Sequence, residues 1–240
     1  MGKRVYADVA DTVILSTESD VLHEWLQFEV DVFDDLQADP HQKYGTLLNV
    51  GSGRRITEPE QPFFDRFGQW FLLEPDAGRR AALAEAVAGR NAVLLGDRIE
   101  QLDTATIPAA DFVLCKYVLQ HIETTLVAPA IQVLRSAAAP GGKVGLFLAL
   151  VDADESTYQL VVPAEAARAV PRRWRRGAHR DETQLSRLID RADFDELISG
   201  NWDFPFIATH HFGRRELAET FPGFAVTGTA TGVGFLQLTV

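Results

Sequence analysis

The sequence predicts an α/β fold whose sheet is mainly parallel and covered by helices on both faces. Short apolar segments alternate with helical patterns along residues 46–150. Each of these segments is almost entirely apolar, which is typical of parallel strands buried on both sides. A glycine-rich turn directly after the first segment points to the same strand–turn–helix architecture.

The expected elements follow one another regularly. A helix is predicted from about Asp20 to Gln37, because its apolar residues fall on one stripe and Asp39-Pro40 ends it. Its carboxylates, Glu29 among them, are expected to face water. Further helices are expected at 62–69, at 77–88 and up to Ala138, and the predicted strands are 46–50, 70–74, 92–95, 111–115 and 143–150.

The remaining chain has a different pattern. A long segment at 151–209 interrupts the alternation, and a short helix is expected over Arg214–Phe221. Val226–Thr229 and Phe235–Val240 read as two closing strands, separated by a glycine-containing turn. We expect this pair to form an antiparallel hairpin at the sheet edge.

Composition narrows the class of protein. The 240 residues are 46% hydrophobic and 24% charged, which is ordinary for a soluble globular protein. A net charge of −11 argues against broad binding to nucleic acid or anionic membranes. The lone Cys115 excludes an internal disulfide, and no metal site is expected from the histidine spacing. Without a long apolar run or a secretory segment, a cytoplasmic location is expected.

The most informative pattern is a pair of strand ends, LLNVGSG at 47–53 and LLEPD at 72–76. Nucleotide-binding βαβ units place a glycine turn after the first strand and a carboxylate, roughly 20 residues on, at the end of the second. Glycines let the backbone approach a ligand, and the carboxylate of Glu74 can accept hydrogen bonds from both ribose hydroxyls. The sequence therefore predicts an adenosine-type ligand.

In this order, the segments LLNVGSG, LLEPD, LLGD, DFVLCKYVLQHI and PGGKVGLFLAL resemble class I S-adenosylmethionine-dependent methyltransferases. The resemblance is to the small-molecule branch that includes the quinone-biosynthesis enzymes. It implies a Rossmann-like, seven-stranded, mostly parallel sheet with an antiparallel last strand and helical lid elements. It also implies a single domain, 1–240, made of a helical cap (1–44), a cofactor-binding core (45–150), a lid or substrate insert (151–212) and a closing helix with strands (213–240).

The resemblance also implies a cofactor site at the carboxyl edge of the sheet. Glu74 would bind the ribose hydroxyls, and Asp97 would accept a hydrogen bond from the adenine amino group. Cys115 and Lys116 would lie beside the methionine tail. The full implied set is Asn49, Gly51, Ser52, Gly53, Glu74, Pro75, Asp97, Arg98, Cys115 and Lys116.

Two positions depart from the family pattern. The family usually has an acid where Asn49 stands, in contact with the methionine ammonium, and a third glycine where Arg55 stands. Asn49 can still accept a hydrogen bond. Arg55 could mean a looser turn or a nonstandard cofactor pose.

Several of these residues also have a structural interpretation. Asp97 could cap the following helix, Cys115 could be a small buried residue, and Lys116 could be a solvated side chain. Glu74 could be a surface carboxylate, although the upstream glycine turn favours ribose binding.

Candidate catalytic residues are His121 and His211, either of which could instead cap or pack. The candidate substrate-binding residues are Trp25, Trp174, His210 and His211. The segment 168–180 carries six arginines and no acid. It is either a solvated lid or a site for a substrate carboxylate or phosphate, with Trp174 stacking on the substrate or anchoring the lid.

The leading hypothesis is transfer of a methyl group from S-adenosylmethionine to an oxygen or nitrogen of a small metabolite, an anionic one if the arginines bind it, with S-adenosylhomocysteine as product. The alternative is a non-methylating protein on the same fold, which would bind the cofactor for a rearrangement or for regulation. A nicotinamide-dependent dehydrogenase is a third possibility, although the full three-glycine fingerprint is missing. We expect a small-molecule partner rather than a nucleic acid or membrane, and nothing in the sequence indicates an oligomeric state.

Overall fold

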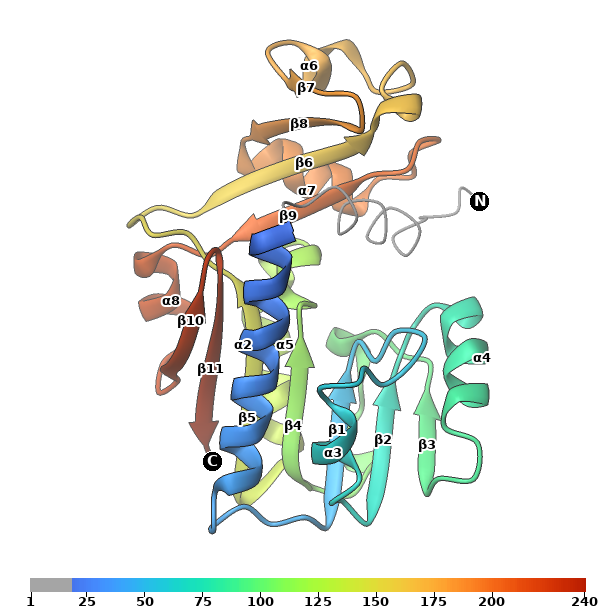
Figure 1. Ribbon diagram of the computed structural model, residues 1–240, viewed down its shortest axis with the longest axis vertical. Coiled ribbons are helices and arrows are strands. Elements are labelled where there is room, and N and C mark those ends of the chain that lie inside the picture. Colours follow the sequence, from blue (N-terminus) through green and yellow to red (C-terminus); the bar gives the residue numbers. More distant parts are fainter. Residues whose placement is uncertain (1–18) are drawn as a thin grey trace.

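A computed structural model describes residues 19–240, with side chains from residue 23 onward (Figure 1). The first part of the expected helical cap, residues 1–18, lies outside the described residues. Helix α2 (Ser19–Ala38) agrees with the helix expected from about Asp20 to Gln37.

The main sheet has seven strands in the order β10-β11-β5-β4-β1-β2-β3. Strand β11 runs antiparallel to both of its neighbours, and the other pairs are parallel. This confirms the expected mostly parallel sheet with an antiparallel last strand. The strands are β1 (Thr46–Val50), β2 (Gln69–Leu73), β3 (Ala92–Leu95), β4 (Ala110–Lys116), β5 (Ala138–Ala149), β10 (Ala225–Ala230) and β11 (Val233–Thr239).

Strand β5 begins earlier than the sequence predicts. Residues 140–142, expected as a tight turn before the strand, lie inside it, and the pairing with β4 shifts register between Ala110 and Phe112. Gly141 has a φ of 78°, and this left-handed conformation produces the local irregularity in the strand. A glycine-rich segment can therefore continue a strand as well as interrupt it.

Helices cover both faces of this sheet. Alternate strand residues such as Leu47 and Phe112 pack with α2, α3 (Gln61–Phe64) and α4 (Ala77–Ala86). The opposite face packs against α5 (Thr124–Ala137) and α8 (Arg214–Thr220). On the first face, Phe28 of α2 meets Phe147 of β5 edge to face, with ring centroids 5.9 Å apart. We call these the α2 face and the α5 face.

The insert between β5 and α8 forms a second sheet, which the sequence did not indicate. Its strands are antiparallel, in the order β7-β8-β6-β9. The expected lid elements were helical, whereas only part of the insert is. Its elements are β6 (Thr157–Pro163), α6 (Arg172–Arg175), β7 (His179–Arg180), β8 (Gln184–Ile189), α7 (Arg191–Ser199) and β9 (Ile207–His211).

The insert lies beyond the carboxyl ends of the central strands (Figure 1). It has its own apolar core, in which Leu160 and Phe194 are fully buried. A backbone bridge between Leu150 and Phe212 connects it to the end of β5. Within the described residues, none of the helices combines the length and apolar character needed to cross a bilayer.

Candidate functional site

The turn after β1 has the conformation that a glycine cradle requires. Gly51 and Gly53 have φ values of 75° and 67°, which residues with side chains rarely adopt. The amides of Gly51 and Ser52 both donate to the Leu73 carbonyl, at 2.8 and 3.1 Å, so the turn is held against β2. A Cβ on Gly51 would lie 2.1 Å from Val118 Cγ2, whereas a Cβ on Gly53 would meet no atom within 4 Å.

Glu74 follows β2 directly and faces this turn. Its side chain is buried; Oε2 accepts from the Gly53 amide at 2.9 Å and Oε1 from the Asp76 amide at 3.0 Å. An ionised carboxylate has about four lone-pair directions, so each oxygen can accept another donor. Burial raises the pKa of Glu74, and the Asp76 amide, the nearby Arg79 charge and the Gly53 amide oppose that rise. Glu74 is thus held in a fixed orientation at the glycine turn.

Asn49, where the family has an acid, lies buried on β1 and its Oδ1 has no hydrogen-bond partner. Buried polar atoms in proteins are normally paired, so an unpaired acceptor near the carboxyl end of a strand fits a ligand that brings an N–H donor. Arg55, the other departure, is exposed. Among the described residues, Tyr117 is the only non-glycine with positive φ, so Arg55 needs no glycine-like conformation.

The residues expected at the adenine end follow β2 and β3. Pro75 and Asp97 are exposed, and Arg98 forms an ion pair with Glu100 at 2.6 Å. The short helix after β3, η1 (Ile99–Gln101), is preceded by Arg98, so Asp97 does not occupy its N-cap. Adenine contact by Asp97 stays a prediction.

Cys115 is a small buried residue, which is the structural one of its two interpretations. It is fully buried in the core of the α5 face, and burial raises the pKa of its thiol to about 12. Strand alternation places Asn49 on the other face of the sheet. The expected contact between the Cys115 side chain and a methionine tail is therefore not supported, and only its backbone can border that site.

Lys116, at the end of β4, is neither solvated nor free. Its Nζ lies 3.0 Å from a carboxylate oxygen of Glu29 on α2 and 3.0 Å from one of Glu60, before α3. Burial lowers the pKa of Lys116, but the two carboxylates outweigh it, and the net pKa is raised. Glu29 therefore does not face water as expected, and sequence reasoning missed both acids as partners of Lys116.

Tyr117 comes directly after β4 and has a φ of 56°. A non-glycine residue in this region is strained, and such strain is often found at functional sites. Burial, and then the charge of Glu29 and a hydrogen bond to it, raise the pKa of the Tyr117 hydroxyl far above its usual value. Tyr117, Glu29, Glu60 and Lys116 therefore form one group, which we call the β4-end cluster.

The three candidate histidines lie in different environments. His121 ends η3 (Leu119–His121), and its Nδ1 is 2.9 Å from the Ala208 carbonyl of β9. His210 is fully buried, and its Nε2 is 2.9 Å from Glu216 of α8. His211 lies beside the end of β5; burial and His210 lower its pKa, while a hydrogen bond to the Leu150 backbone opposes the change.

The two candidate tryptophans lie far apart in the fold. Trp25 of α2 donates from its indole nitrogen to the Thr231 carbonyl at 2.7 Å, in the β10–β11 turn. Trp174 is fully buried in the core of the insert, 4.9 Å from the ring centroid of Trp202. The structure thus favours the lid-anchor interpretation of Trp174 over stacking on a substrate.

The arginines of 168–180 are exposed around α6, at the outer end of the insert (Figure 1). Arg173 forms an ion pair with Glu196 and lies over the Trp174 ring, 4.4 Å from its centroid. Arg172, Arg175 and Arg176 line a shallow hollow of about 550 Å³. The group is separated from the glycine turn by the sheet of the insert.

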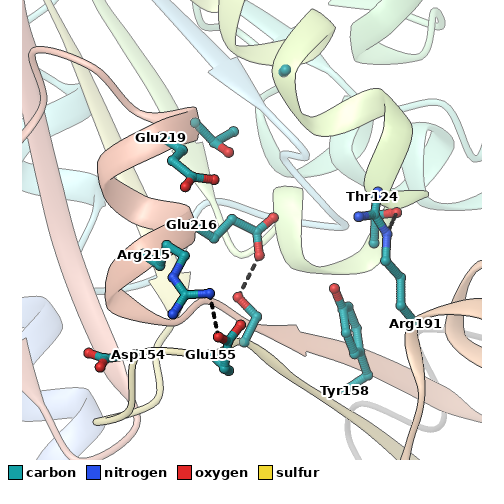
Figure 2. A pocket seen from close by; sticks show the side chains of 11 residues that line it. Thr124, Asp154, Glu155, Tyr158, Arg191, Arg215, Glu216 and Glu219 are labelled. Atoms are coloured by element: carbon teal, nitrogen blue, oxygen red, sulfur yellow. Dashed lines mark hydrogen bonds and ion pairs between the residues drawn. The ribbon is translucent and has the colours of Figure 1, made fainter.

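A second hollow, of about 440 Å³, lies between α5, α8 and the insert (Figure 2). Tyr158, Arg191 and Glu216 line it, and Glu216 accepts from Ser156 as well as binding His210. No residue of the expected cofactor set is part of its lining. The position of His210 therefore does not support its expected substrate role, because its ring is fully buried and binds Glu216.

No family model matches the chain, and no curated protein matches its sequence. Solved structures do match. The DhpI–S-adenosylhomocysteine complex is 14% identical with a TM-score of 0.58, covering 98% of this chain and 91% of that one. A 1,6-didemethyltoxoflavin-N1-methyltransferase from Burkholderia thailandensis, solved with its substrate and S-adenosylhomocysteine, is 13% identical with a TM-score of 0.52 and coverage of 100% and 93%.

An O-methyltransferase family protein from Burkholderia thailandensis also matches, at 13% identity and a TM-score of 0.52. The match covers 87% of this chain but only 55% of that longer one. Identities this low establish the architecture alone. Strand order, the antiparallel last strand and these structures agree: the chain has the fold of the class I S-adenosylmethionine-dependent methyltransferases.

Proposed function

We propose that the protein binds S-adenosylmethionine and transfers its methyl group to an oxygen or nitrogen of a small molecule. The observation that carries the proposal is the opposed arrangement of the glycine cradle and Glu74, with the Gly53 amide bonded to the carboxylate at 2.9 Å. A buried carboxylate that faces a glycine turn suits the two hydroxyls of a ribose. The unpaired Asn49 Oδ1 suits an ammonium group at the other end of the same ligand.

In this proposal the cofactor and the protein have separate roles. The bound cofactor supplies an activated methyl group, so the protein needs mainly to align the reactants and exclude water. Glu74 and the glycine turn hold the ribose, Asp97 borders the adenine, and Asn49 accepts from the methionine ammonium. The insert lies beyond the carboxyl ends of the central strands, where the acceptor would enter (Figure 1).

Of the two candidate bases, we assign the proton-accepting role to His211. Its lowered pKa keeps the imidazole neutral at pH 7, as a base requires. Burial lowers the pKa of His121 to about 4, which makes it a weak base near pH 7, and we assign it a positioning role between η3 and β9.

Isothermal calorimetry with S-adenosylhomocysteine tests the cofactor assignment. The wild-type protein should bind it, and Glu74→Ala should weaken binding by more than about a hundredfold, because two hydrogen bonds to a charged acceptor, each about 1.5–3 kcal/mol, are lost. Glu85→Ala, an exposed carboxylate on α4, is the matched control and should bind normally. Equal affinity of Glu74→Ala and wild type would contradict the ribose role.

Transfer of an isotopically labelled methyl group to extracted small molecules tests the reaction itself. Labelled product that disappears in Glu74→Ala supports methyl transfer. Cofactor binding without any transfer would favour the non-methylating alternative, and binding of NAD in place of S-adenosylhomocysteine would favour the dehydrogenase.

A further inference from the structure

The strand order defines the side from which a second reactant can approach. In the proposed function, which this inference extends, the adenosine lies over β2 and β3, where Glu74 and Asp97 follow the strands. The reactive end of the cofactor then points toward β1 and β4. The acceptor must meet it at the carboxyl end of β4, where the β4-end cluster is located.

The charges of this cluster do not cancel. The exposed side-chain fractions of Glu29, Glu60 and Lys116 are 12%, 5% and 16%, so solvent screens them weakly. Two carboxylates against one ammonium leave a net charge of −1. Glu60 also accepts hydrogen bonds from the amide and hydroxyl of Thr57, at 2.6 and 2.7 Å. Glu29 therefore accepts fewer hydrogen bonds than Glu60.

A second observation marks this place as a ligand site. Asn49 pairs in register with Leu114, two residues before Lys116, and the side chains of all three project from the α2 face of the sheet. The buried, unpaired Oδ1 of Asn49 therefore lies on the same face as the cluster, one strand away. In the proposed function this Oδ1 accepts from the methionine ammonium, which brings the reactive end of the cofactor beside the cluster. The excess carboxylate there favours a second ligand that carries positive charge.

We propose that Glu29 is an ammonium-binding group at the methyl-transfer point, so that the methyl acceptor is an amine that arrives positively charged. The bound ammonium would give one proton to the Glu29 carboxylate. Its nitrogen lone pair would then form the N–C bond as the bond from the methyl carbon to sulfur breaks, with that electron pair staying on sulfur. Burial strengthens this selection, because a carboxylate in a low-dielectric setting attracts a cation more than it would in water. Neutral hydroxyl compounds gain less from the same group, and anionic acceptors are repelled.

The arginine group does not offset this charge. Its exposed members surround α6 at the outer end of the insert, with the sheet of the insert between them and β4 (Figure 1). An acceptor at the end of β4 therefore faces Glu29 rather than the arginines. The structure thus argues for a cationic acceptor rather than the carboxylate or phosphate that the arginine-rich sequence suggested.

The test uses two cofactor analogues that differ at the transfer point. S-adenosylhomocysteine is neutral at sulfur, whereas sinefungin carries an ammonium group where the cofactor carries its methyl. Calorimetry at pH 7.5 should show sinefungin binding roughly tenfold or more tightly than S-adenosylhomocysteine, as expected for a hydrogen bond to a charged group. Glu29→Gln, which makes the cluster neutral, should abolish this preference and keep the affinity for S-adenosylhomocysteine within about threefold. Asp35→Asn, an exposed carboxylate on α2, is the matched control.

The outcomes separate the two proposals. If neither analogue binds the wild-type protein, the proposed function fails. If both bind and Glu29→Gln keeps the preference for sinefungin, or weakens both analogues equally, the role of Glu29 is wrong.

Tyr117→Phe provides a second variant that keeps the charge of Glu29. It removes only the hydroxyl that shares this carboxylate, so the preference for sinefungin should persist or grow. A drop to the level of Glu29→Gln would overturn the proposal.

Discussion

At the scale of single residues, His121 couples proton binding to stability. Burial of its ring lowers its pKa to about 4, and the hydrogen bond to the Ala208 carbonyl only partly opposes this. The unfolded chain, with an ordinary histidine pKa of about 6.5, binds the proton more readily than the folded chain. The contribution of His121 to stability is therefore complete above about pH 6.5 and is lost as the pH falls toward 4.

We predict that His121→Asn flattens this part of the pH profile. The asparagine amide can still donate to Ala208 but does not titrate in this range. The wild-type free energy of unfolding should fall by about 2–3 kcal/mol more than that of the variant between pH 6.5 and 4. Urea titrations across that range measure the difference. Parallel profiles would show that His121 is not a titrating group of the folded state.

At the scale of elements, the glycine turn after β1 depends on the absence of a side chain at one position. Gly51 combines a φ of 75° with a position 2.1 Å from Val118 Cγ2 for any added Cβ. The left-handed conformation costs about 1–2 kcal/mol for alanine, and overpacking typically adds about 1–3 kcal/mol. Gly89, after α4, has a φ of 84° with no atom within 4 Å of an added Cβ, so it isolates the backbone cost.

We predict that Gly51→Ala lowers the free energy of unfolding by about 2–5 kcal/mol, against about 1–2 kcal/mol for Gly89→Ala. Combining Gly51→Ala with Val118→Ala should recover part of the loss, because the clashing methyl group is gone. Denaturant unfolding of the four variants, including Val118→Ala alone, measures this coupling. Strictly additive effects, or equal losses at the two glycines, would contradict the steric explanation.

At the scale of the whole molecule, the main sheet could be predicted and the surroundings of the site could not. Strands such as residues 70–73 and 112–115 are continuous apolar runs, and their order along the chain determines the architecture. Tertiary partners leave no comparable signal. Lys116 is 87 residues from Glu29, and on its own Glu29 reads as one more exposed carboxylate of α2.

The sheet of the insert was missed for a similar reason. Gln184–Ile189 of β8 alternates polar and apolar residues only weakly, because Leu185 and Ile189 are buried while Leu188 is 66% exposed. The arginine-rich segment beside it suggested a solvated lid. The packing of Trp174 against the rest of the insert is visible only once the strands are paired.

The insert and the main sheet are joined by a helix cap supplied from another element. The side chain of Glu123 at the N-cap of α5 makes no capping hydrogen bond. Instead Asp195 of α7 accepts from the amide and the hydroxyl of Thr124, both at 2.7 Å. A carboxylate at this position satisfies an otherwise unpaired amide and interacts favourably with the helix dipole. The stability of α5 and the position of the insert therefore depend on the same side chain.

We predict that Asp195→Ala lowers the free energy of unfolding by about 1–2 kcal/mol, the usual effect of losing a cap. Because Asp195 belongs to the insert and Thr124 to the core, amide hydrogen exchange should accelerate both at the start of α5 and in α7 and β6. Asp203→Asn, an exposed carboxylate in the loop before β9, should change neither region. Faster exchange in α7 alone would show that Asp195 stabilises only its own helix, and the insert would then be held over the carboxyl edge by the Leu150–Phe212 bridge and the His121–Ala208 contact instead.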